Sequence, residues 1–142
     1  MMHELEFASH PGNLCLVRDF VRKFLATIEM PEPQKDLIIL GLDEACTNVI
    51  RYAYEHCTNK LMVLACERTA SGIVFRLRDF GAKCPPEKLK GRALENVQPG
   101  GLGIHLIRRA FDHVDYRHCD QGTELVLEKM LDDRCGAGAA AT

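Results

Sequence analysis

The sequence predicts an α+β domain, a two-layer sandwich in which helices cover one face of a mainly antiparallel sheet. Three observations support this. Helical periodicity fills the first part of the chain, strand-like alternation follows residue 60, and a further helix precedes two more strands. The 142 residues, 46% of them hydrophobic, are enough to close one ordinary core. We therefore expect one domain over residues 1–131 and a disordered tail over residues 132–142.

Two helices are expected first. Residues Asn13 to Ile28 place apolar side chains at helical spacing and charged ones opposite, which predicts an amphipathic helix. The segment from Met30 to Pro33 should end it, because proline lacks an N–H donor and restricts the residue before it. A second helix should start just after Pro33 and run to about Tyr54.

A β-hairpin is expected next. Leu61 to Cys66 is a short apolar run, Thr69 to Gly72 is turn-like, and alternating residues follow as far as Asp79. Residues 81–101 contain several prolines and charges without periodicity, and a loop of that length inside a domain is usually functional.

The remaining elements are short. Ile104 to Phe111 predicts a third helix, and Val114 to His118 and Thr123 to Met130 predict two final strands. The expected order is therefore helix, helix, strand, strand, loop, helix, strand, strand.

Composition limits the classes of function. The formal net charge of −2 gives no basic field, so we expect no nucleic-acid partner. The first thirty residues show neither a signal-peptide centre nor a membrane span, so we expect a cytoplasmic protein without a membrane partner. The seven cysteines have no paired or finger-like spacing, which favours reduced thiols over a structural zinc site.

Three short motifs carry candidate chemistry. Glu44 and Asn48 lie four apart in the second helix, so a carboxylate and an amide would project side by side, although such a pair can also simply face water. Asp79 and Gly81 stand at a strand end, where a carboxylate can accept a hydrogen bond from an exocyclic amine. The glycines of residues 100–103 open a helix, a position that admits close approach of phosphates.

The order of these motifs resembles a known fold. Glu44-x-x-x-Asn48, Asp79-x-Gly81, Gly101-x-Gly103 before a helix and Gly122-Thr123 before the last strand are similar to the Bergerat, or histidine-kinase-like, ATPase fold of the GHKL superfamily. Residues 42–48, 51–54 and 100–107 resemble the anti-sigma-factor serine/threonine kinases of bacteria. The resemblance covers nearly the whole chain.

The resemblance implies a role for each motif residue. Glu44 would be the catalytic base, and Asn48 would bind Mg²⁺ that bridges the phosphates of ATP. Asp79 would hold the adenine amino group, and Gly81 would shape the adenine pocket. The remaining cofactor-binding residues would be Gly101 and Gly103, which let the lid and the helix end meet the phosphates, Leu102 between them, and Thr123, which supports the base from the last strand.

The resemblance also implies an activity and partners. The domain would be an ATP-binding serine/threonine kinase that phosphorylates a STAS-type anti-anti-sigma protein, forms a homodimer, and can also sequester a sigma factor. Two alternatives stay open: a partner-switch module without kinase activity, and a switch kinase that binds no sigma factor. Lys83 and Tyr52 stand where relatives often have glycine and histidine, which leaves the lid and retained activity open.

Overall fold

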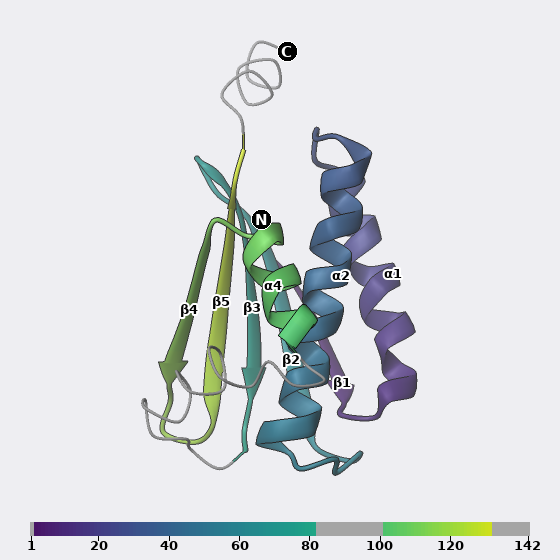
Figure 1. Cartoon of the computed structure of the whole chain (residues 1–142), viewed down its shortest axis with the longest axis vertical. Helices are drawn as coiled ribbons and strands as arrows, with labels where there is room; N and C mark the ends of the chain where they lie inside the picture. The colour runs from purple at the N-terminus through teal and green to yellow at the C-terminus, as the bar shows by residue number, and fades with distance from the viewer. Residues whose placement is uncertain (1, 82–100, 132–142) are drawn as a thin grey trace.

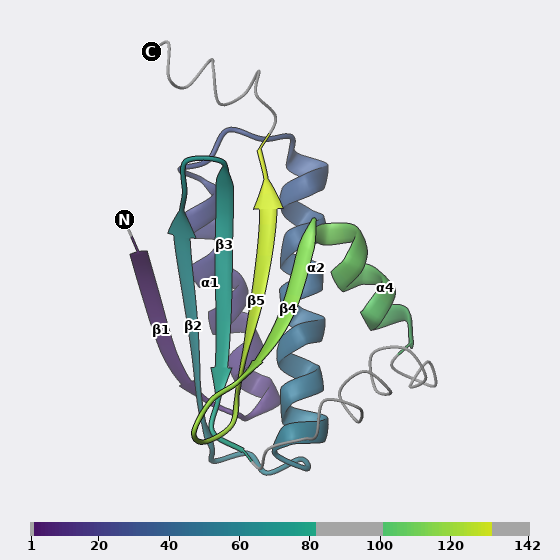
Figure 2. The same ribbon diagram turned by 90° about the vertical axis from the view of Figure 1, so that its left-hand side faces the viewer.

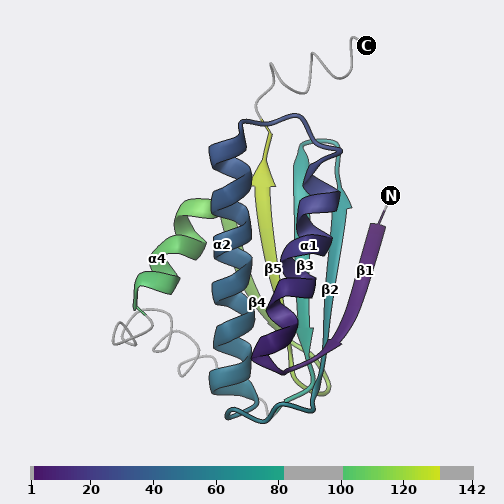
Figure 3. The same ribbon diagram turned by 90° about the vertical axis from the view of Figure 1, so that its right-hand side faces the viewer.

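A five-stranded antiparallel sheet forms one layer of the protein, and three α-helices form the other, in the computed structural model that describes residues 2–81 and 101–131 (Figure 1). The helices lie on the same face of the sheet, as the two side views show (Figures 2 and 3). The fold class predicted from the sequence, an α+β two-layer sandwich, is confirmed. None of the described helices is long and apolar enough to cross a membrane.

The sheet has the strand order β1-β2-β3-β5-β4, so β3 lies at its centre. The strands are β1 (Met2–Ala8), β2 (Leu61–Arg68), β3 (Gly72–Asp79), β4 (His113–His118) and β5 (Thr123–Met130). Every neighbouring pair in this order is antiparallel. The predicted hairpin and the two final strands are therefore confirmed, and β3 ends at Asp79 as expected.

The strand β1 is a correction to the expected order, which began with a helix. Leu5 and Phe7 turn toward the core, whereas Glu4 and Glu6 are exposed, so the segment has the alternation of a half-buried strand. It pairs with β2 along its length, from Met2 opposite Glu67 onward. The prediction was wrong because it looked only for long apolar runs in this segment and not for alternation.

The first two helices have the expected type and somewhat different bounds. A short 3₁₀ turn, η1 (Pro11–Asn13), leads into α1 (Leu14–Leu25), so Ile28 is buried beyond the helix end. The central helix α2 (Glu32–Asn48) begins before Pro33, because the first turn of a helix tolerates a residue without an N–H donor. A π-helical turn, η2 (Val49–Ala53), continues it almost to the predicted end.

The third helix, α4 (Gly101–Ala110), begins three residues earlier than Ile104, the predicted start. The prediction treated the glycines as a preceding loop, but their backbone forms the first helical turn. Most of the predicted loop, residues 82–100, and the predicted tail, residues 132–142, lie outside the described residues.

Aromatic side chains join the two layers. The Phe75 ring, fully buried on β3, makes edge-to-face contacts with Phe24 of α1 and with Phe111 just after α4, at centroid separations of 5.7 and 5.8 Å. This geometry stabilises aromatic pairs beyond the burial of their area. The row therefore fixes α1 and the end of α4 against the central strand.

Helix α4 packs directly on α2 at Gly41. A Cβ atom at Gly41 would lie 3.0 Å from the Ala110 Cβ and 3.1 Å from the Phe111 Cε2, closer than ordinary contact. A glycine therefore permits this close approach of the two helices. The contact sets where α4, with its glycine-containing first turn, lies relative to the middle of α2.

We expect Gly41→Val to lower the free energy of unfolding by about 2 kcal/mol, because the added methyl groups overpack the contact between the helices. The gain in helix propensity, below about 1 kcal/mol, does not offset this. Urea denaturation measures the change. Leu40→Val is the matched control, since Leu40 is 50% exposed and should change stability by no more than about 0.5 kcal/mol. Equal stability of both variants would contradict the packing argument.

Candidate nucleotide-binding site

Two polar side chains of α2 lie on its side toward α4. Gly41 contacts α4, and Glu44 and Asn48 follow it at helical spacing on the same face. Both side chains are half-buried, and neither has a hydrogen-bond or ion-pair partner among the described residues. The structure therefore brings the carboxylate and the amide together in a partly enclosed place, and not on a helix face that simply points at water.

The neighbouring polar residues of α2 are paired. The Arg18 Nη1 of α1 donates to the Asp43 Oδ1 at 2.9 Å, and the Thr47 Oγ1 donates to the Asp43 carbonyl oxygen at 2.9 Å. The ion pair joins α1 to α2 beside Glu44. Among the described residues, the Glu44 and Asn48 side chains have no such partner, so their donors and acceptors are available to a ligand.

Asp79 is a buried carboxylate at the end of β3, only 4% exposed. Its Oδ1 accepts the Gly81 N–H at 3.0 Å, and the backbone N–H of Thr123 on β5 also donates to this carboxylate. Burial raises its pKa above the ordinary value of 3.8, although these donors and the Arg78 guanidinium oppose the shift. A carboxylate has about four acceptor sites, so capacity remains for another donor.

Glycines let three chain segments meet around Asp79. A Cβ atom at Gly81 would lie 2.7 Å from the Ala53 carbonyl oxygen, so this strand end touches the π-helical turn that follows Asn48. Gly122 has φ +82°, and a Cβ atom there would lie 2.1 Å from the Asp79 carbonyl oxygen. The turn between β4 and β5 therefore needs glycine at Gly122 for both its conformation and its contact.

Most of these elements gather at one end of the molecule. The end of β3, the turn η2 and the β4–β5 turn lie at the lower end in Figures 2 and 3, and the first turn of α4 lies higher, beside the lower half of α2. Gly101, Leu102 and Gly103 form the first turn of α4, where backbone N–H groups favour anions. Lys83, which departs from the family pattern, lies outside the described residues. Tyr52, the other departure, is half-buried in η2, with the Arg51 guanidinium 5.8 Å from its ring centroid.

Comparison with known families identifies the family of this domain. The profile of the histidine kinase-like ATPase domain matches residues 7–129, which include Glu44, Asn48 and Asp79. The chain belongs to this family. The resemblance seen in the motifs, to the GHKL superfamily and its anti-sigma kinases, is confirmed at this level.

Curated relatives of this ATPase domain include the serine-protein kinases RsbW of Bacillus cereus and Bacillus anthracis. Each is 23% identical, over 100 and 103 residues respectively, with 65% of this chain and 61% of the relative covered. The chain thus spans about three fifths of the length of these relatives. The crystal structure of the RsbU and RsbW domains of a Mycobacterium tuberculosis protein matches with a TM-score of 0.66 and 15% identity. The match covers 92% of this chain and 32% of the Mycobacterium tuberculosis chain, and it supports the fold.

The residues present in this ATPase domain fit a magnesium nucleotide. A buried carboxylate with spare acceptor capacity suits the exocyclic amine of a base, and the first turn of α4 suits phosphates. Mg²⁺ usually takes one or two protein oxygens beside phosphates and waters, so the free amide of Asn48 fits as a ligand. Among the residues described, no three His, Cys, Asp or Glu side chains converge on a separate metal site.

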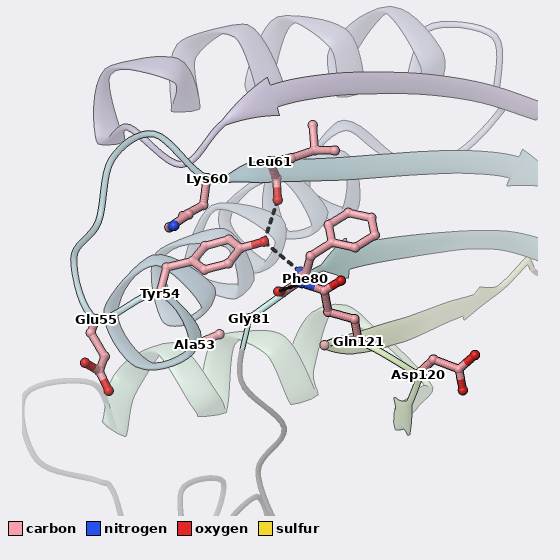
Figure 4. Close-up of a pocket in the computed structure, with 10 residues that line it drawn as sticks. Ala53, Tyr54, Glu55, Lys60, Leu61, Phe80, Gly81, Asp120 and Gln121 are labelled. Carbon is pink, nitrogen blue, oxygen red and sulfur yellow. Dashed lines mark hydrogen bonds between the residues drawn. The ribbon is translucent and has the colours of Figure 1, made fainter.

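Sequence reasoning missed two residues beside the candidate site, Tyr54 and Gln121. Both line a cavity of about 680 Å³ that is also lined by Phe80 and Lys60 (Figure 4). Tyr54 is buried, and its hydroxyl reaches the backbone of Phe80. A tyrosine near a helix end and a glutamine in a turn carry no local pattern that could have revealed this.

The raised pKa of Asp79 predicts a pH-dependent difference between wild type and Asp79→Asn. A carboxyl whose folded pKa exceeds its unfolded pKa stabilises the fold at low pH and loses that contribution as pH rises through the folded value. Lowering the pH from 7 toward 3.8 should therefore stabilise wild type relative to the variant. Urea denaturation of both proteins across this range measures the difference, and a difference that does not change with pH would contradict the burial argument.

Proposed function

We propose that this domain is an ATP-dependent serine/threonine protein kinase of the anti-sigma type, which phosphorylates a STAS-type anti-anti-sigma partner. The observation that carries the proposal is the pair Glu44 and Asn48, half-buried on the face of α2 toward α4 and without a partner in the part of the chain that the structure describes. Relatives of this chain are named serine-protein kinases, which supports the same reaction class.

The adenine base of the nucleotide would be recognised at the end of β3. Asp79 would accept a hydrogen bond from the adenine amino group, while the N–H groups of Gly81 and Thr123 hold the carboxylate in place. The absence of a side chain at Gly81 leaves Ala53, the last residue of η2, in contact with this strand end. The two halves of the proposed site, base end and phosphate end, are thereby joined.

The phosphate end would lie between α2 and the first turn of α4. Gly101, Leu102 and Gly103 would offer backbone N–H groups to the phosphates, and Asn48 would ligate Mg²⁺. Magnesium held at Asn48 would supply positive charge against the charge that develops on the phosphates. Phosphoryl transfer depends chiefly on such alignment and neutralisation, so little further machinery is needed.

Glu44 would act as the general base that accepts the proton of the attacking hydroxyl. Its carboxylate lies one helical turn before Asn48 and has no partner among the described residues, so it is free to accept a proton or orient a hydroxyl. The attacking group would be a serine or threonine hydroxyl of the partner. Residues 1–131 would form the kinase domain, which we further propose to act as a homodimer and to capture a sigma factor.

We expect Glu44→Ala to keep Mg-ATP binding and to lower phosphoryl transfer at least about 100-fold, the usual contribution of a positioned base. The measurement is transfer of label from γ-labelled ATP to the STAS protein encoded beside this gene. Glu128→Gln on β5 is the control, because its half-buried side chain belongs to another element and should leave transfer unchanged. Wild type that binds Mg-ATP but labels no neighbouring STAS protein would favour a partner-switch module without kinase activity.

Asp79→Asn should abolish nucleotide binding, because the amide presents an N–H group where the adenine amine needs an acceptor. Titration calorimetry with Mg-ATP measures this directly. Circular dichroism confirms that the variant is folded. Normal ATP affinity in this variant would show that residues other than Asp79 recognise the adenine base.

A further inference from the structure

The peptide group of Phe80 lies just beyond the strand ladder. The pairing of β3 with β2 ends at Asp79, and its pairing with β5 ends at Arg78. Two side chains from other elements hold the Phe80 backbone instead. Its N–H donates to the Tyr54 hydroxyl at 2.6 Å, and its carbonyl oxygen accepts from the Gln121 Nε2 at 3.1 Å.

The Tyr54 hydroxyl is itself fixed. It donates to the Leu61 carbonyl oxygen at 2.5 Å while it accepts from Phe80, so one oxygen joins the start of β2 to the end of β3 (Figure 4). The side chain is only 6% exposed, and burial raises its pKa, which keeps the hydroxyl protonated and able to donate. A buried hydroxyl with both bonds made leaves its partners little freedom.

This connection acts on the segment that carries Asp79. The residues Asp79, Phe80 and Gly81 are consecutive, and the Gly81 N–H donates to the Asp79 carboxylate. Gly122 packs against the Asp79 carbonyl from the same turn that supplies Gln121. A carboxylate recognises an amine through a directional bond, so a small shift of this peptide would misplace the acceptor.

We propose that Tyr54 and Gln121 are positioning residues, a clamp on the Phe80 peptide that aims the Asp79 carboxylate and so sets the base specificity of the nucleotide site. The inference rests on the proposed role of Asp79 in binding the base, and it does not depend on kinase activity. Neither clamp residue touches the nucleotide. Both act through the Phe80 backbone: Tyr54 holds its N–H and Gln121 holds its carbonyl oxygen.

The test is Tyr54→Phe, which keeps the ring and removes the hydroxyl. Affinities for Mg-ATP and Mg-ITP are measured by calorimetry, because inosine replaces the exocyclic amine with a carbonyl. Both hydrogen bonds of the hydroxyl are lost, and the one that holds the Phe80 N–H acts on the Asp79 segment. We expect its loss to lower ATP affinity about tenfold, with ITP affinity nearly unchanged. In the transfer assay, KM for ATP should rise while kcat stays unchanged.

Two further variants complete the experiment. Tyr116→Phe is the matched control, because Tyr116 lies half-buried on β4 and its hydroxyl makes no hydrogen bond in the described part of the chain. The Arg108 guanidinium acts on this hydroxyl through its charge alone, so loss of the hydroxyl should keep the ATP preference. Gln121→Ala removes the other contact from an exposed turn position, so the fold should tolerate it. We expect it to lower the ATP preference about threefold, as for a weaker exposed bond.

Several outcomes would overturn the inference. An ATP-to-ITP preference in Tyr54→Phe equal to that of wild type would do so, as would equal weakening of both nucleotides together with a lower Tm, which marks a merely structural role. Wild type without preference for ATP would overturn it as well. Wild type that prefers ATP but labels no STAS partner would count against the proposed kinase activity alone.

Discussion

The approach of α4 to α2 at Gly41 is the constraint on which the arrangement of this protein depends. The same helix, α2, must cover the centre of the sheet and also present Glu44 and Asn48 toward α4. A larger residue at Gly41 would separate the helices and move the first turn of α4 away from those side chains. The aromatic row through Phe75 then holds α1 and the end of α4 on the sheet. Site geometry and core packing are therefore decided by the same few contacts.

The site is assembled from groups that the fold alone would not favour. Asp79 is a desolvated carboxylate, and within residues 2–81 and 101–131 nothing uses the hydrogen-bonding capacity of the half-buried Glu44 and Asn48. Burying polar groups without full compensation costs stability. Such unused capacity is what a ligand can satisfy, so binding recovers part of that cost. The buried Cys66, whose pKa burial raises to about 12, illustrates the contrary case of an inert core group.

Much of this fold follows from local patterns, and much of the candidate site from motif spacing. Helical periodicity predicted α1 and α2, and alternation predicted the hairpin that ends at Asp79. The edge strand β1 was not predicted, because its seven residues have only modest hydrophobicity. Tyr54 and Gln121 escaped for another reason: their bonds to Phe80 join residues 26 and 41 positions apart. Contacts of that kind depend on tertiary geometry, which no local pattern encodes.

The Phe80 amide has a consequence for how this protein can be observed in solution. It is hydrogen-bonded to a buried phenol and not to a neighbouring strand, so its protection from hydrogen exchange reports opening of this one segment. Amides within β3 exchange through opening of the sheet, which is a separate event. Comparing the two rates, by NMR, would measure the local stability of the segment from Asp79 to Gly81 independently of the stability of the whole domain.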